Sequence, residues 1–193
     1  AAALLAPQQA SVEQTSQGTR APATLVDSFD GLGVGFEGPQ GKYEGRNPSD
    51  NSLAVGPNHI VQTVNSRLAV FTKKGAMFDT TGRVIRGPVP TNRIWSGLGG
   101  QCEARPNGDA VIRYDQLAGR WLFVMPIFRR PANDSTGPFS MCYAVSVGPD
   151  PLGPYYKYEF NEDGSEKFST EDVVATRDIS LYWKMTKGID VIF

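Results

Sequence analysis

Four short runs of β-prone residues follow one another between residues 110 and 160, and they constrain the fold more than any other feature. The runs cover residues 110–114, 120–127, 140–147 and 155–160. The segments between them are rich in Asp, Gly, Pro, Asn and Ser, which are the residues that turns favour. Four consecutive strands with such connections predict an antiparallel meander, which is the unit of one blade of a β-propeller.

The preceding half of the chain carries a weaker version of this pattern. Residues 60–64 and 68–71 predict two strands joined by a tight turn at Asn65-Ser66. Residues 86–109 are rich in Gly, Pro and Asn and predict a long surface excursion. Because no window before residue 160 shows a sustained 3.6-residue period with caps, no helix is expected there. The predicted fold is all-β, with antiparallel four-stranded meanders of the β-propeller blade type over residues 25–160.

A turn motif separates the first two of the four runs. Asp115 precedes the turn, and Arg120 and Trp121 follow it. An aspartate in this place suits an Asx turn, in which the carboxylate accepts backbone N–H groups. Arg120 is placed to reach back to that carboxylate, and Trp121 offers a large face for packing between neighbouring sheets. We therefore assign the three residues a structural role, and no catalytic residue is assigned.

Length and composition limit the classes of protein to which the chain can belong. Its 193 residues, 40% of them hydrophobic, suffice for one domain with a buried core. A net charge of −1 without a clustered basic face argues against nucleic-acid binding. No window is long and apolar enough to predict a transmembrane span. Residues 1–24 lack periodicity and predict a flexible arm, which is either the remnant of a signal peptide or an Ala-rich terminus.

The two cysteines, Cys102 and Cys142, have two interpretations. In an exported protein they are expected to pair, and the chain-entropy model gives such a bridge roughly 4 kcal/mol. In a cytosolic protein they would be two buried thiols. The exported character of the N-terminal residues favours the disulfide.

Several segments together resemble a known family. They are DNSLAVGPNHIVQTVNSRLAVF, GGQCEA, GDAVIRYDQLAGRWLFVMPIF and MCYAVSVGPDPLGPYYKYEF. In order and spacing they are similar to the N-terminal part of a largely uncharacterised family of bacterial exported proteins of β-propeller type. The resemblance covers roughly residues 48–160 and implies that Cys102 and Cys142 occupy recurrent positions, which supports the disulfide. The resemblance implies no activity, because none is agreed for the family.

The chain also departs from this family. A propeller needs at least four blades to close, and residues 25–160 have room for about two. Residues 161–193 diverge from the family pattern and predict a short helix capped by Ser169, followed by strands at 179–185 and 189–193. Since unpaired sheet edges are a liability in a lone protein, we expect an incomplete propeller or one that a partner completes.

Acidic residues are the main candidates for chemistry. Paired carboxylates perform acid–base work in glycoside hydrolysis, although aspartate is also expected in turns. Asn47 and Asp50 could supply oxygens to calcium, without the full spacing of a known calcium loop. His59 is the only histidine, so a His-rich metal site is not expected, and no other cofactor is predicted. The five aspartates considered are Asp50, Asp109, Asp115, Asp134 and Asp150.

These features predict a non-enzymatic, exported protein that acts as a binding or scaffolding subunit of a larger assembly. It would have a protein partner, with a glycan as a further possible ligand. The alternative is a portion of a propeller hydrolase acting on glycans. The two hypotheses make different predictions: the hydrolase requires carboxylates that converge on one site, and their mutation should abolish turnover of a glycan.

Overall fold

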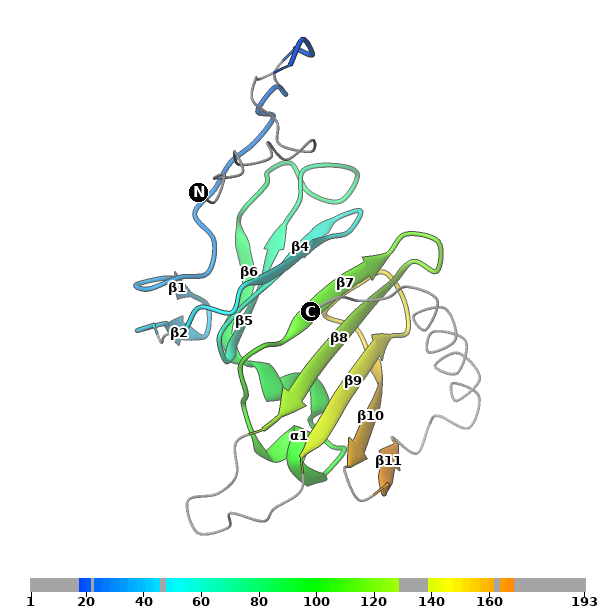
Figure 1. Cartoon of the computed structure of the whole chain (residues 1–193). Helices are drawn as coiled ribbons and strands as arrows, with labels where there is room; N and C mark the ends of the chain where they lie inside the picture. Colours follow the sequence, from blue (N-terminus) through cyan, green and yellow to red (C-terminus); the bar gives the residue numbers. More distant parts are fainter. Residues whose placement is uncertain (1–17, 22, 46–47, 129–138, 162–163, 169–193) are drawn as a thin grey trace, which may run out of the picture.

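The computed structural model describes residues 18–21, 23–45, 48–128, 139–161 and 164–168. They form an all-β protein whose sheets are antiparallel (Figure 1). A four-stranded and a five-stranded sheet lie side by side, with a small two-stranded hairpin next to the first. The elements in chain order are β1 (Glu37–Gly38), β2 (Gly41–Lys42), β3 (Ser52–Val55), β4 (His59–Val64), β5 (Arg67–Thr72), β6 (Val84–Pro90), the 3-10 helix η1 (Thr91–Trp95), α1 (Gly100–Ala104), β7 (Val111–Asp115), β8 (Arg120–Ile127), β9 (Ser140–Ser146), β10 (Tyr155–Asn161) and β11 (Glu166–Phe168).

The four-stranded sheet is a meander in the order β3-β4-β5-β6, so each strand pairs with its neighbour in sequence. The pairing of β4 with β5 ends at Val64 and Arg67, which leaves Asn65 and Ser66 in the turn. Asn65 has a φ of 50°, a left-handed conformation that asparagine tolerates better than most residues. The turn predicted at this place is confirmed.

The five-stranded sheet has the order β7-β8-β9-β10-β11 and is again a meander. Its first four strands correspond to the four β-prone runs. The fifth strand, β11, lies in the segment 161–193. The helix predicted at Ser169 and the strands predicted at 179–185 and 189–193 lie outside the described residues.

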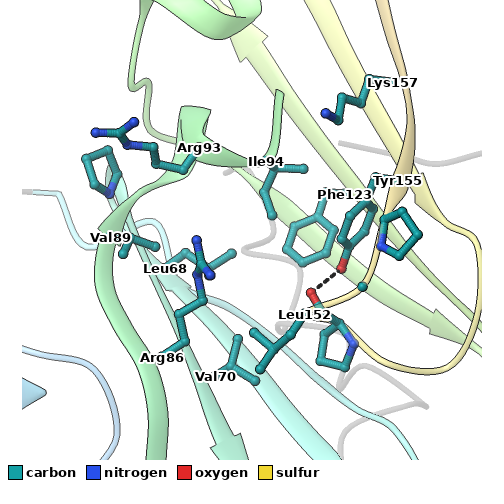
Figure 2. A pocket seen from close by; sticks show the side chains of 14 residues that line it. Leu68, Val70, Arg86, Val89, Arg93, Ile94, Phe123, Leu152, Tyr155 and Lys157 are labelled. Atoms are coloured by element: carbon teal, nitrogen blue, oxygen red, sulfur yellow. Dashed lines mark hydrogen bonds between the residues drawn. The ribbon is translucent and has the colours of Figure 1, made fainter. Parts of the chain in front are cut away.

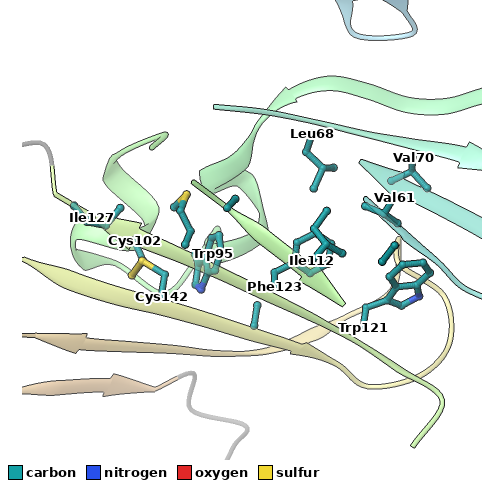
Figure 3. Close-up of a cluster of buried hydrophobic side chains, with 14 residues drawn as sticks. Val61, Leu68, Val70, Trp95, Cys102, Ile112, Trp121, Phe123, Ile127 and Cys142 are labelled. Atoms are coloured by element: carbon teal, nitrogen blue, oxygen red, sulfur yellow. A yellow bond between two sulfur atoms is a disulfide. The ribbon is translucent and has the colours of Figure 1, made fainter. Parts of the chain in front are cut away.

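The main hydrophobic core lies between the two sheets (Figure 3). Every second side chain of β8 is buried, which is the period expected of a strand with one face toward a core. The four-stranded sheet meets these side chains with residues from β3, β4 and β5. Labelled members of the cluster are Val61, Leu68, Val70, Trp95, Cys102, Ile112, Trp121, Phe123, Ile127 and Cys142.

Hydrogen bonds also join the two sheets where their first strands lie against each other. The Oγ of Ser52 in β3 accepts the N–H of Ile112 in β7 at 3.0 Å. The hydroxyl of Thr63 in β4 donates to the carbonyl of Ala110 at 3.2 Å. Because both hydroxyls are tied to the backbone of the other sheet, the relative position of β3 and β7 is specified by more than apolar packing.

The segment before β3 covers the opposite face of the four-stranded sheet. Leu32 and Tyr43 from this segment are buried in a second cluster with Phe71 of β5. Phe29 and Phe36 pack on the same ring, with centroids 5.1 and 5.8 Å from that of Phe71. The two central strands, β4 and β5, are therefore buried on both faces. Of the arm predicted over 1–24, the described residues 18–21 and 23–24 are exposed.

The surface excursion predicted over residues 86–109 is wrong, as is the expectation of no helix before residue 160. The segment continues β6, forms η1 and α1, and contributes to the core. Trp95 is 1% exposed and its indole N–H donates to the carbonyl of Tyr143 at 2.9 Å. Helices of five residues are too short to leave a 3.6-residue period in the sequence, so their absence from the prediction has a physical reason.

The disulfide is present and joins α1 to β9. Cys102 and Cys142 are both fully buried, with Cα atoms 5.7 Å apart and a separation of 40 in sequence. Both cysteines are paired, so the alternative of two buried thiols is excluded.

The finer prediction of propeller blades is only partly met by this architecture. The sheet β3–β6 has the predicted four strands, whereas the second sheet has five. Among the ranges described, the sheets do not close into a ring. In the same ranges, no helix has the length and apolar character needed to cross a membrane.

Candidate functional site

A pocket of about 180 Å³ opens in the seam between the two sheets (Figure 2). One wall comes from β5, β6 and η1, and the other from β8, β10 and the turn before β10. The lining residues are Leu68, Val70, Arg86, Val89, Pro90, Arg93, Ile94, Phe123, Pro151, Leu152, Gly153, Pro154, Tyr155 and Lys157.

The inner part of the pocket is apolar. Leu68, Val70 and Phe123 belong to the main core and are at most 3% exposed. Phe123 meets the ring of Tyr155 edge-on, with centroids 5.6 Å apart. Leu152 also lines the pocket and is 42% exposed. An apolar group that entered the pocket would therefore meet hydrocarbon at its inner end, and charged side chains and backbone elsewhere in the lining.

The rim of the pocket is positively charged. Arg86 of β6 and Arg93 of η1 lie on one side, and Lys157 of β10 lies on the other (Figure 2). No aspartate or glutamate is among the lining residues in the described part of the chain. Lys157 donates to the carbonyl of Ser96 at 2.6 Å, and its charge is one of the influences that lower the pKa of Glu103. In the part of the chain described, neither guanidinium forms a hydrogen bond or an ion pair within the protein.

Tyr155 holds one wall in place. Its hydroxyl donates to the carbonyl of Pro151 at 2.7 Å. Burial raises the pKa of Tyr155 strongly, the charge of Asp150 raises it further, and Arg86 acts in the opposite direction. The phenol therefore stays protonated and remains a donor. Asp150 accepts the N–H of Leu152 at 2.9 Å. Hydrogen bonds therefore stabilise both ends of the turn before β10.

The turn motif singled out in the sequence lies in β7, β8 and their connection, and none of its three residues lines the pocket. Asp115 accepts the N–H groups of Leu117 and Ala118 at 2.8 and 3.0 Å. Arg120 is its cross-strand partner in the register of β7 and β8. These contacts are those of an Asx turn.

Trp121 is fully buried and links the two sheets. Its indole N–H donates to the carbonyl of Pro149 at 2.9 Å. It packs against Tyr114 with ring centroids 4.8 Å apart. A Cβ atom added to Gly56, which follows β3, would lie 2.5 Å from the Trp121 ring. The glycine therefore allows this close approach between the sheets.

Asp50, considered as a calcium ligand, lies beside another carboxylate instead. It precedes β3, Asp109 precedes β7, and both have positive φ angles, 44° and 58°. Asn65 donates to Asp50 at 3.3 Å. The pKa of Asp109 is raised by burial, and further by the charge of Asp50 and a hydrogen bond with it. Two carboxylates next to an amide donor fall short of the six to eight oxygens that calcium takes.

Of the other candidate residues, those that the structure describes lie elsewhere. Asn47 lies outside the described residues, as does Asp134. Asp115 and Asp150 accept backbone N–H groups in two separate turns. Among the residues that the structure describes, no group of three or more His, Cys, Asp and Glu side chains could hold a metal ion.

Two buried polar side chains were not recognised in the sequence. Glu159 of β10 is 2% exposed and accepts the N–H groups of Gln101 and Cys102 at 3.1 and 2.8 Å. His59 is 4% exposed, and its Nδ1 has no hydrogen-bond partner among the described residues. Burial lowers the pKa of His59, and the charge of Asp150 offsets part of that effect.

Comparisons with protein-family models, with curated proteins and with solved structures found no match to this chain. The resemblance to exported propeller proteins therefore stays a prediction, and the pocket is interpreted from its own chemistry.

Proposed function

We propose that the chain is a non-enzymatic, exported binding or scaffolding module of a larger assembly, and that the pocket between its sheets is the binding site. The observation that carries the proposal is the pocket itself: an apolar inner end with three cationic side chains at its rim and, among the residues that the structure describes, no carboxylate in its lining. Binding sites are concave and mostly apolar, with a few polar groups that orient the ligand.

The arrangement of the sheets supports a propeller-type module. Each sheet is a meander, and their first strands, β3 and β7, lie against each other. The chain passes from the last strand of the first sheet through η1 and α1 to the first strand of the second. Successive propeller blades repeat radially about an axis in this manner. Further sheets, from a partner or from more chain, would complete such a ring.

The disulfide supports export. Buried disulfides persist in oxidising compartments and are rare in the cytosol of most organisms. The Cys102–Cys142 bridge joins two elements of the core, so it belongs to the folded protein rather than to a surface redox site. A bacterial periplasm, a cell surface and an extracellular space all satisfy this condition.

The assembly is tested by native mass spectrometry of the protein purified from its source without reductant. We expect a defined complex that is heavier than one chain of 21.0 kDa. A clean monomer in the native preparation would contradict the scaffolding role.

A portion of a glycan hydrolase is the second candidate, and the contact between Asp50 and Asp109 favours it. The raised pKa of Asp109 is a property of general acids. However, glycosidases hold their two carboxyl groups roughly 5 to 9.5 Å apart, so that a sugar or a water fits between them. Carboxylates that bond to each other leave no such room. We expect no turnover on a panel of glycans, and turnover that Asp109→Asn abolishes would favour the hydrolase.

A further inference from the structure

We propose that the pocket binds an acidic segment of a partner protein, which inserts one apolar side chain between the sheets and places carboxylates against Arg86 and Arg93. This inference rests on the proposed binding function and specifies the chemistry of the ligand.

The size of the pocket favours a single side chain. Small-molecule and cofactor sites commonly measure roughly 300 to 1,000 Å³, whereas this pocket measures about 180 Å³. A cavity of roughly 150 Å³ lined by apolar side chains accommodates a benzene ring. A phenylalanine or leucine side chain is therefore of the right size.

The inner end of the pocket favours an apolar group. Leu68, Val70 and Phe123 line it from both sheets, and they would offer an inserted group no hydrogen bond. The hydroxyl of Tyr155 is already donated to Pro151. A sugar ring would lose the hydration of its hydroxyl groups here without replacement, which is costly. An aromatic or aliphatic side chain has no such penalty.

The positions of the charges favour a chain that extends beyond the pocket on either side. Arg86 lies on β6 and Arg93 on η1, and both side chains are exposed. A guanidinium binds a carboxylate through two parallel hydrogen bonds. Acidic residues next to the inserted side chain would meet these two groups. Lys157 adds a third positive charge across the opening, although it is already bonded to Ser96.

Fluorescence anisotropy with a labelled peptide tests the inference. The probe is EDEFEDE, acetylated and amidated at its ends. One control peptide, EDEAEDE, lacks the apolar side chain, and the other, QNQFQNQ, lacks the charges. The protein variants are Arg86→Gln and Arg93→Gln. The matched control is Arg83→Gln, because Arg83 is also exposed, directly precedes β6 and does not line the pocket.

We expect the probe to bind, and each control peptide to bind at least ten-fold more weakly. Loss of one charge-assisted hydrogen bond costs about ten-fold in affinity, so Arg86→Gln and Arg93→Gln should each raise Kd by about that factor. Arg83→Gln should leave Kd unchanged. The affinity of the native protein should also fall as salt rises from 50 to 500 mM, because the paired charges are at the surface.

Three results would overturn the inference. They are no binding of EDEFEDE at millimolar protein, equal binding of EDEAEDE, and an equal effect of all three arginine substitutions. Thermal melts of the variants serve as the control that each variant remains folded. If the native protein forms a complex but the peptide does not bind, the scaffolding role stands and only this assignment of the ligand fails.

Discussion

The buried carboxylate of Glu159 should be a main determinant of stability, and Glu159→Gln tests it with almost no change of shape. The native side chain accepts two backbone N–H groups at the start of α1, from Gln101 and Cys102. Glutamine can accept from one of them but must turn its NH₂ group toward the other. A bond to a charged acceptor contributes about 1.5 to 3 kcal/mol, and an unsatisfied buried donor costs about 1 to 3 kcal/mol.

We therefore expect Glu159→Gln to lower the free energy of unfolding by about 3 kcal/mol. For a chain of this size that corresponds to a fall in Tm of roughly 6 to 12 °C. The assay is urea unfolding of the oxidised protein, followed by circular dichroism. Glu166→Gln on β11 is the control, because Glu166 is exposed and surface substitutions usually change stability by less than about 0.5 kcal/mol. Equal stability of the two variants would refute the role assigned to Glu159.

Other substitutions test the seam between the sheets and the pH dependence of stability. Gly56→Ala should destabilise the protein by about 1 to 3 kcal/mol in urea unfolding, because its Cβ would lie 2.5 Å from Trp121. The control is Gly33→Ala, whose Cβ meets nothing within 4 Å among the described residues. Equal effects of the two substitutions would contradict the close approach at Gly56. Burial and a neighbouring carboxylate raise the pKa of Asp109, so this carboxyl group favours folding in acid and opposes folding as the pH rises. Asp109→Asn should therefore raise Tm at pH 7 but not at pH 3. No gain in Tm at pH 7 would count against this reasoning. Burial lowers the pKa of His59, so protonation favours the unfolded chain as the pH falls through about 6.5. Between pH 7.5 and 5.5, the native protein should lose more stability in urea unfolding than the His59→Gln variant. Equal losses would reject a role of His59 in the pH dependence.

The features that the sequence predicted are those with a local signature. The alternation of buried side chains in β8 lies within eight residues of chain, and the turn at Asp115 depends on bonds to residues two and three positions away. The disulfide was predicted from the exported character of the chain, and the fold places its two cysteines together. The strand and turn patterns do not depend on how the two sheets meet, whereas the disulfide does depend on the fold.

The features that the sequence did not predict arise from contacts between distant segments. Arg86, Arg93 and Lys157 lie on three elements, and no spacing in the sequence marks them as a group. Asp50 was considered with Asn47, its neighbour in sequence, whereas the fold places it beside Asp109. Trp95 lies in a Gly- and Pro-rich stretch that is typical of surface loops, whereas the fold packs it into the core between the sheets and bonds it to Tyr143.

The pocket depends on the segment between β6 and β7, and this relates the stability of the core to binding. Asn92 of η1 donates to the carbonyl of Glu103 in α1 at 2.5 Å, and the carboxylate of Glu103 accepts the N–H groups of Gly97 and Gly99. The η1 segment that carries Arg93 is thus fastened to α1. In turn, α1 is fastened to the second sheet by Glu159 and by the disulfide. A binding site whose charges must stay at fixed positions needs such support, which gives a physical reason for a buried carboxylate and a disulfide on a helix of five residues.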